Sequence, residues 1–427
     1  MDTGSFLSGT VESIAYRGAG ILRPEGGPVV FVHGGVCAGE RIEARVSRVH
    51  ARFAEAELVA VAESAPCRIA PVCRLPDGTR VPGCVYDHMD YAAEVATKRT
   101  QLADFLRGAF RKAARPDLAE RIDDLLAPPV PSPADLHYRN KIVLHAGRTE
   151  GTRVLGYLGD DNRTVVDIPA CPLAAEPINR ELAALRADRD FRRAVRDGDD
   201  VTLRWTPVDG VVPWIGRPSP RAAPLTEHAF FGDLEVPLDG FYQVNPAVAD
   251  LLAAALADHA AALRPGAVID AYCGIGILGL AVLSRLPADS ARLLGMETGR
   301  AAVAAARRNA RRLGAATAEY ACCPVAEGID AALQEVGADG TFVILDPPRD
   351  GLEPEVVRTL LARRPAHLAY VSCSPDRLAR DLERLCAADG GAFEPVAARL
   401  FDMFPRTMHF ETVVFLARRE SHALTYP

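Results

Sequence analysis

Residues 267–279 read Ala-Val-Ile-Asp-Ala-Tyr-Cys-Gly-Ile-Gly-Ile-Leu-Gly. The short apolar run is typical of a buried strand, and the glycines after it allow a tight turn into a helix. Such a unit brings the backbone close to a ligand at the carboxyl edge of a sheet. Glu297 ends the next apolar run, where its carboxylate can hydrogen-bond ribose hydroxyls. Alone, the glycine pattern fits a dinucleotide, an adenosylmethionine or plain tight packing.

The same rhythm continues on both sides of this stretch. An alanine- and leucine-rich helix is predicted over 248–263, and apolar strands recur at 293–297, 342–345 and 369–372. Alternating helices and strands indicate a doubly wound α/β domain with a mostly parallel sheet. We assign residues 236–427 to this domain.

The N-terminal half has a different pattern. Short strands parted by glycine-rich turns predict a small β-barrel over 1–63, of a kind that often binds nucleic acid. Residues 64–235 are assigned to a central, β-rich domain that also contains a helix over about 90–114 and a proline-rich linker at 128–133. The predicted fold class is therefore α/β and β, in three domains.

Composition sets limits on location and partners. With 49% hydrophobic and 25% charged residues, no long uninterrupted apolar run and no N-terminal secretion signal, we expect a cytoplasmic protein without a membrane partner. The net charge is −7, from 49 basic and 56 acidic residues, which argues mildly against nucleic-acid binding. A local basic patch is still compatible with that charge, and Arg45, Arg48 and Arg52 are candidates for it.

Two further motifs follow apolar strands. Asp346 opens the sequence Asp-Pro-Pro-Arg, in which the prolines fix the backbone as a rigid ledge. Cys373 follows the strand at 369–372. Because both strands end at the carboxyl edge, these side chains and the glycine turn are expected to lie together. By position alone, a cysteine there is more often a core residue than a reactive one.

The motifs that accompany Cys373 favour a reactive cysteine over a core residue. Asp-Pro-Pro-Arg at 346–349, the residues around Cys373 and the segment 402–413, which contains His-Phe-Glu-Thr, together resemble the RNA 5-methyluridine (uracil-C5) methyltransferase family. The resemblance covers nearly the whole chain: 18–46 resembles its RNA-binding TRAM barrel, 138–141 and 167–173 its central domain, and 240–246 the start of its catalytic domain. It is similar to the TRAM-bearing members that act on 23S ribosomal RNA.

The resemblance implies roles for individual residues. Cys373 corresponds to the covalent nucleophile, which adds to C6 of uracil so that C5 can accept a methyl group. Glu411 corresponds to the base that removes the C5 proton. We expect the thiol pKa of Cys373 to be lowered, or a base to assist it. The predicted S-adenosylmethionine site consists of Gln243, Tyr272, Gly274, Glu297 and Asp346.

Four cysteines form another candidate site. Many relatives hold a four-iron, four-sulfur cluster on three clustered cysteines and a distant one, which here correspond to Cys67, Cys73, Cys84 and Cys171. The third departs from the pattern, because an insertion at 74–83 precedes Cys84. A cluster is favoured; a structural zinc site or a lost site are the alternatives.

The sequence thus predicts an enzyme that methylates C5 of a specific uridine in RNA, with ribosomal RNA favoured over transfer RNA. The same chemistry on transfer RNA, and a non-catalytic RNA-binding or assembly protein on this scaffold, are the alternatives. The target uridine, protein partners and oligomeric state are not given by the sequence.

Overall fold

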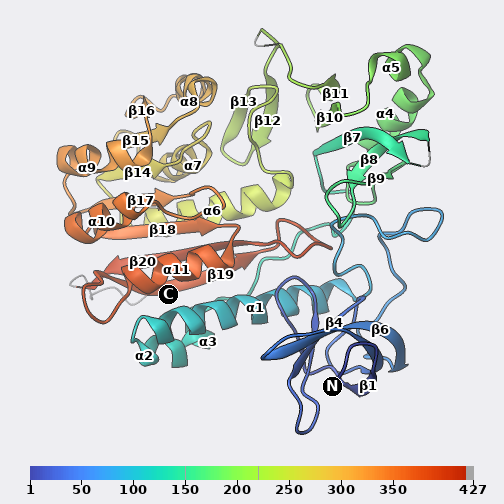
Figure 1. Cartoon of the computed structure of the whole chain (residues 1–427). Helices are drawn as coiled ribbons and strands as arrows, with labels where there is room; N and C mark the ends of the chain where they lie inside the picture. The colour runs from blue at the N-terminus through green and yellow to red at the C-terminus, as the bar shows by residue number, and fades with distance from the viewer. Residues whose placement is uncertain (150, 220, 420–427) are drawn as a thin grey trace.

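Three sheets and a hairpin organise the chain (Figure 1). The computed structural model describes residues 1–149, 151–219 and 221–419. The N-terminal sheet lies below the central sheet, and both lie to one side of the large C-terminal sheet (Figure 1). The predicted combination of an N-terminal β unit and a C-terminal α/β domain is confirmed.

The N-terminal sheet has six strands in the order β1-β5-β6-β4-β3-β2. They are β1 (Phe6–Thr10), β2 (Ser13–Ile14), β3 (Gly20–Leu22), β4 (Val29–His33), β5 (Arg41–Val49) and β6 (Phe53–Glu63). Along β5, buried Ile42, Ala44 and Val46 alternate with exposed residues, as expected for a curled sheet with one face in a core. The predicted basic residues Arg45 and Arg48 are on its exposed positions.

A helical segment follows the N-terminal sheet and packs against the C-terminal domain. The segment comprises α1 (Tyr91–Lys112), α2 (Pro116–Glu120) and α3 (Ile122–Leu125). The Asp90 side chain caps α1 by accepting a hydrogen bond from the Ala93 amide at 2.8 Å. The apolar face of α1, with Leu102, Leu106 and Phe110, packs into the core of the C-terminal sheet and beside α11. The helix therefore ties residues near the barrel to the C-terminal domain.

The central sheet has five strands in the order β11-β10-β7-β8-β9. They are β7 (Lys141–Thr149), β8 (Thr152–Leu158), β9 (Val165–Asp167), β10 (Asp200–Thr206) and β11 (Gly210–Ile215), and α4 (Glu176–Ala187) and α5 (Arg189–Ala194) precede β10. Their core contains Leu144, Ile178 and Leu203.

A hairpin joins this unit to the C-terminal domain. It consists of β12 (Leu225–Ala229) and β13 (Gly232–Val236) and packs on α8. The buried Asn309 amide accepts a hydrogen bond from the Glu235 N–H at 2.7 Å and donates one to its carbonyl at 3.1 Å. The hairpin thus packs on the C-terminal side of the predicted boundary between 235 and 236.

The C-terminal sheet has seven strands in the order β16-β15-β14-β17-β18-β20-β19. They are β14 (Ala267–Ala271), β15 (Arg292–Glu297), β16 (Ala318–Cys322), β17 (Thr341–Leu345), β18 (His367–Ser372), β19 (Phe393–Phe401) and β20 (Glu411–Arg418). The helices are α6 (Pro246–Leu263), α7 (Ile277–Arg285), α8 (Arg300–Arg312), α9 (Val325–Val336), α10 (Pro354–Arg363) and α11 (Pro375–Leu385). One face packs on α6, α7 and α8 and the other on α1, α9, α10 and α11, which is the predicted doubly wound arrangement.

Helix α6 is the one helix in the described residues that is long and apolar enough to cross a membrane by length and composition. Its buried residues Leu252, Leu256 and Ala260 belong to the same core cluster as Val268 of β14. Its apolar character is therefore explained by packing against the sheet.

Candidate active site

The carboxyl ends of adjacent parallel strands bring the predicted site residues together. Tyr272 follows β14, Glu297 ends β15, Asp346 follows β17 and Cys373 follows β18. These side chains line one cavity of about 1400 Å³, together with Gln243, Gly274 and Glu411. All seven residues proposed for catalysis and donor binding therefore lie at one site.

The turn after β14 has the conformation that its glycines require. Gly276 has a φ of +88°, and a Cβ there would lie 2.7 Å from the hydroxyl oxygen of Tyr320. Asp270 accepts a hydrogen bond from the Gly279 amide at 2.9 Å, which holds the start of α7. Tyr272 adopts a φ of +65°, a strained value for a non-glycine residue, and its hydroxyl donates to Glu353.

One end of the cavity fits S-adenosylmethionine. The Glu297 carboxylate accepts hydrogen bonds from the Gly274 amide at 3.3 Å and the Gly299 amide at 2.7 Å, which fixes it where it can receive ribose hydroxyls. Pro324 and Val325 provide an apolar wall for a planar base. Burial raises the pKa of Asp346 to about 7, so a cationic ligand beside it would stabilise its charged form.

Strand pairing places the two predicted catalytic residues opposite one another. Ser372 at the end of β18 pairs with Thr412 near the start of antiparallel β20. Cys373 directly follows Ser372 and Glu411 directly precedes Thr412, so both residues lie at the same edge of the sheet, and both line the cavity. Antiparallel pairing of β18 and β20 thus brings the predicted nucleophile and the predicted base to one edge of the sheet.

The electrostatics at this mouth differ from the expectation of a lowered thiol pKa. Burial, and then the nearby Glu411, raise the pKa of Cys373 to about 11, while Arg349 acts in the opposite direction. Burial, and then Asp346, also raise the pKa of Glu411 well above its usual value. Cys373 is therefore a thiol at neutral pH in the ligand-free protein, and burial among acidic groups favours the neutral form of Glu411.

Two further residues complete the mouth. Arg349 ends the Asp-Pro-Pro-Arg ledge and lowers the pKa of both Cys373 and Glu411. His409 also lines the cavity, and burial, followed by Arg349 and other cations, lowers its pKa to about 4, so it is neutral at pH 7. Both residues stand in motifs noted in the sequence, but their positions relative to the thiol were not predicted.

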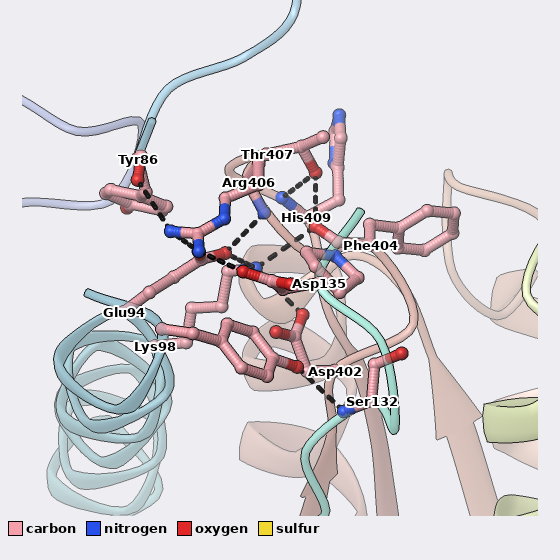
Figure 2. A network of polar contacts seen from close by, with 12 residues as sticks. Tyr86, Glu94, Lys98, Ser132, Asp135, Asp402, Phe404, Arg406, Thr407 and His409 are labelled. Carbon is pink, nitrogen blue, oxygen red and sulfur yellow. Dashed lines mark hydrogen bonds and ion pairs between the residues drawn. The ribbon is translucent and has the colours of Figure 1, made fainter. Parts of the chain in front are cut away.

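A buried polar network holds the segment that leads to Glu411 (Figure 2). Lys98 on α1 is fully buried and donates to Glu94 at 2.7 Å and to Asp402 at 2.8 Å. Arg406, with a φ of +67°, donates to the Met89 carbonyl at 2.8 Å and contacts Asp135. Lys98 of α1 thus bridges Glu94 of the same helix and Asp402, which follows β19. This ion pair fixes the loop between β19 and β20 against α1.

The predicted four-cysteine site is not formed. Cys73, Cys84 and Cys171 lie in the core of the central domain, whereas Cys67 packs against the barrel core, near Cys37. Across the described ranges, the cysteine, histidine and acidic side chains form no group of three or more that could hold a metal ion. The expectation of an iron–sulfur cluster on all four cysteines is therefore not supported by the described residues.

The reason is local geometry on both sides of Cys67. Arg68, the next residue, donates to the buried Glu40 carboxylate at 2.7 Å and to the Gly35 carbonyl at 2.9 Å, which anchors this position in the barrel. The insertion at 74–83 closes on itself, with the Val81 amide donating to the Cys73 carbonyl at 3.0 Å. Cys67 and Cys73 are thus held in separate structures.

A doubly wound sheet with a nucleotide-type turn, a donor-binding end and a cysteine–glutamate pair defines a methyltransferase with a Rossmann-like catalytic domain. Residues 233–419 match the family described as tRNA (Uracil-5-)-methyltransferase. The chain is 29% identical to an uncharacterised RNA methyltransferase of Gloeobacter violaceus, covering 98% of this chain and 99% of that one. It is 26% identical to an uncharacterised RNA methyltransferase of Bacillus cereus, covering 98% of each.

The fold also matches a solved structure over most of its length. It superposes on the tRNA (uracil-54, C5)-methyltransferase of Pyrococcus abyssi, solved in complex with S-adenosyl-L-homocysteine, with a TM-score of 0.69 and 22% identity, covering 96% of this chain and 100% of that one. These matches support an S-adenosylmethionine-dependent RNA methyltransferase, and the match to the uracil-5-methyltransferase family model falls on its catalytic domain.

Proposed function

We propose that this enzyme methylates C5 of a specific uridine in RNA, most consistently 23S ribosomal RNA, through a covalent bond between Cys373 and C6 of the base. The observation that carries the proposal is the single cavity that Cys373 and Glu411 line together with Glu297 and Asp346, at the sheet edge where β18 and β20 meet. A uridine in folded RNA has to leave its stack to reach this mouth.

The chemistry assigns one task to each residue. Cys373 loses its proton to solvent and gives an electron pair to C6, so that electron density builds up at C5. Gln243, Tyr272, Glu297 and Asp346 would hold S-adenosylmethionine, which would supply the electrophilic methyl group for C5 and keep the electron pair of the broken S–CH3 bond as S-adenosylhomocysteine. Glu411 as carboxylate then takes the C5 proton, the C5–C6 double bond re-forms, and the Cys373 sulfur leaves with the electron pair of its bond to C6.

The charges of the pocket support this order. In the ligand-free protein the pKa values of Cys373, Asp346 and Glu411 are all raised, chiefly by burial. The positive charge of the donor favours the ionised form of nearby groups and therefore lowers all three pKa values. The nucleophile and the base are in this way activated only when the methyl donor is in place.

A trapping experiment tests the covalent step. RNA that contains 5-fluorouridine is incubated with protein and S-adenosylmethionine; since fluorine at C5 cannot be removed as a proton, an adduct that survives denaturation should accumulate. Cys373→Ala should give none, while Cys322→Ala, which removes an exposed cysteine, should behave like wild type. Absence of an adduct with the wild-type protein, or an equal adduct with Cys373→Ala, rejects the mechanism.

Glu411→Gln separates the two halves of the reaction. With ordinary uridine RNA this variant should form the covalent species but release it about 10²–10⁴-fold more slowly, since the C5 proton has no acceptor. Glu355→Gln, an exposed change on α10, is the matched control. Normal turnover by Glu411→Gln removes Glu411 as the base.

The RNA target needs its own test. The TRAM-like barrel favours ribosomal RNA, whereas the name of the similar archaeal enzyme, which acts on uracil-54 of tRNA, supports transfer RNA as the second candidate. Mapping 5-methyluridine in both RNAs from cells with and without the gene decides between them. A site lost only from transfer RNA excludes the ribosomal assignment, and no lost site in either favours the non-catalytic alternative.

A further inference from the structure

The turn between β2 and β3 of the barrel holds a strained arginine. The Ala15 amide donates to the Ala19 carbonyl at 2.8 Å and the Gly18 amide to the Ala15 carbonyl at 2.9 Å, which closes a tight turn around Tyr16 and Arg17. Arg17 has a φ of +75°, in the left-handed region that non-glycine residues rarely adopt. Such strain persists where the surrounding structure enforces it, and it is frequent at functional sites.

The surroundings of this turn belong to the catalytic half of the molecule. The buried Gln101 of α1 donates to the carbonyls of Ile14 at 3.1 Å and Ala15 at 2.9 Å. Since α1 packs in the core of the C-terminal sheet, it fixes the barrel turn relative to the catalytic domain.

The turn also touches the walls of the active-site cavity. The Tyr16 ring packs edge-on against Phe410, the residue before Glu411, with 6.2 Å between ring centroids. A Cβ on Gly18 would lie 2.2 Å from a methyl carbon of Val85, and Val85 lines the cavity. The barrel therefore reaches the mouth where the nucleophile and base lie.

Cations from separate parts of the chain surround this mouth. Arg349, Arg139, Lys98 and Arg17 each act on His409 to favour its neutral form. The charge of Lys98 is balanced by its two buried carboxylates. In the described part of the chain, no carboxylate forms an ion pair with Arg17, Arg139 or Arg349. Arg139 and Arg349 line the cavity, and Arg17 stands on the barrel turn whose Tyr16 packs against Phe410 beside it. Cations gathered from three parts of a protein with a net charge of −7 mark a site for an anion.

We infer that Arg17, presented by the barrel turn, binds a backbone phosphate next to the target uridine, with Arg139 and Arg349 completing the cationic rim. The inference rests on the proposed RNA substrate and extends it: the barrel supplies part of the active-site entrance in addition to any remote RNA contact. Arg17 is exposed and its guanidinium is free to form the bidentate contact that phosphate favours.

Arg17→Gly tests the inference, because it should weaken RNA binding without lowering the stability of the fold. Glycine accepts the left-handed conformation, so the melting temperature should stay equal or rise. Affinity for a fluorescein-labelled, 12-nucleotide single-stranded RNA with one central uridine among adenosines should fall about tenfold, and the slope of log affinity against log salt should decrease by about one.

Arg264→Gly is the matched control. Arg264 is also an exposed arginine in the left-handed region, with a φ of +51°, but it caps the end of α6 at the opposite edge of the sheet. It should leave RNA affinity and salt slope unchanged.

A second measurement identifies the phosphate. RNAs with a neutral methylphosphonate directly 5′ or 3′ of the uridine should bind wild type more weakly at one of these positions, and Arg17→Gly should lose that difference. If Arg17→Gly keeps wild-type affinity and salt slope, or if both proteins respond equally to each methylphosphonate, the inference is wrong. These assays need no methyl transfer. Arg17-dependent binding without 5-methyluridine formation would reject the proposed chemistry alone.

Discussion

The protonation state of Cys373 sets the first step of the reaction. With a pKa of about 11, roughly one thiol in a thousand is ionised at pH 8. We expect the thiolate absorbance at 240 nm, taken as wild type minus Cys373→Ala, to be absent from pH 7 to 9.5. Sinefungin, a donor analogue with an amino group in place of the methyl sulfonium, should shift its appearance to lower pH, because a nearby cation favours the thiolate. A midpoint at or below pH 8.5 in the protein alone would contradict the raised pKa.

For single residues, the sequence predicted which side chains form the site better than it predicted their protonation. The strand before Cys373 was sufficient to place it at the carboxyl edge, and the family resemblance pointed to Glu411; the antiparallel pairing that brings Glu411 to that edge is seen only in the structure. The raised pKa of Cys373 was not predictable, since it depends on burial by residues far away in the chain. Arg17 was missed for the same reason: its relation to His409 exists only after the barrel has packed on α1.

Among the elements, α1 and the loop after β19 depend on one buried cation. Lys98→Met removes the cation that Glu94 and Asp402 share and leaves Glu94 with Arg406 as its ion-pair partner; removing one member of a buried ion pair typically costs about 3–5 kcal/mol. Burial already raises the pKa of Glu94 to about 7, and loss of Lys98 removes a charge that lowers it. Stability from a carboxyl with a raised pKa in the folded state is present at low pH and lost as the pH rises. The melting temperature should therefore drop more at pH 8 than at pH 5.5, while Lys112→Met, an exposed change on the same helix, should alter it little. An equal drop at both pH values would show that packing, and not charge, is what Lys98 contributes.

The segments around Cys67 and Cys73 predict the iron content of the purified protein. Because Arg68 holds its neighbour Cys67 in the barrel, we expect anaerobically purified protein to contain far less than four irons per chain. Cys67→Ser should leave the iron content unchanged. Four irons in the wild type that disappear in Cys67→Ser would restore the full ligand set. The family resemblance could not anticipate this, because it aligns cysteines by spacing, whereas the insertion at 74–83 forms a turn of its own.

Across the whole molecule, the alternation of helices and strands predicted the doubly wound domain, and the short N-terminal strands predicted the curled sheet. The pattern could not tell where α1 docks. Periodicity identifies the apolar face of a helix but not its partner, and α1 stands within the segment 64–235, assigned to the central domain, while its face packs on the C-terminal core.

That docking predicts how the molecule can be divided. A fragment of residues 233–419, the span of the family match, lacks the helical segment that covers part of its own core. It also leaves the edge of β19 open, since the Ala127 and Val130 amides donate to the carbonyls of Ala398 at 2.9 Å and Leu400 at 2.8 Å. An exposed apolar face beside an open strand edge favours aggregation, so this fragment should be insoluble or should melt well below the full chain. Coexpression with residues 88–132 should restore solubility and donor binding, measured by circular dichroism and calorimetric titration with S-adenosylhomocysteine. A fragment 233–419 that folds alone with the melting temperature of the whole protein would show that α1 is an accessory to the catalytic domain, and that the barrel turn at Arg17 is held by a weaker connection than the one described.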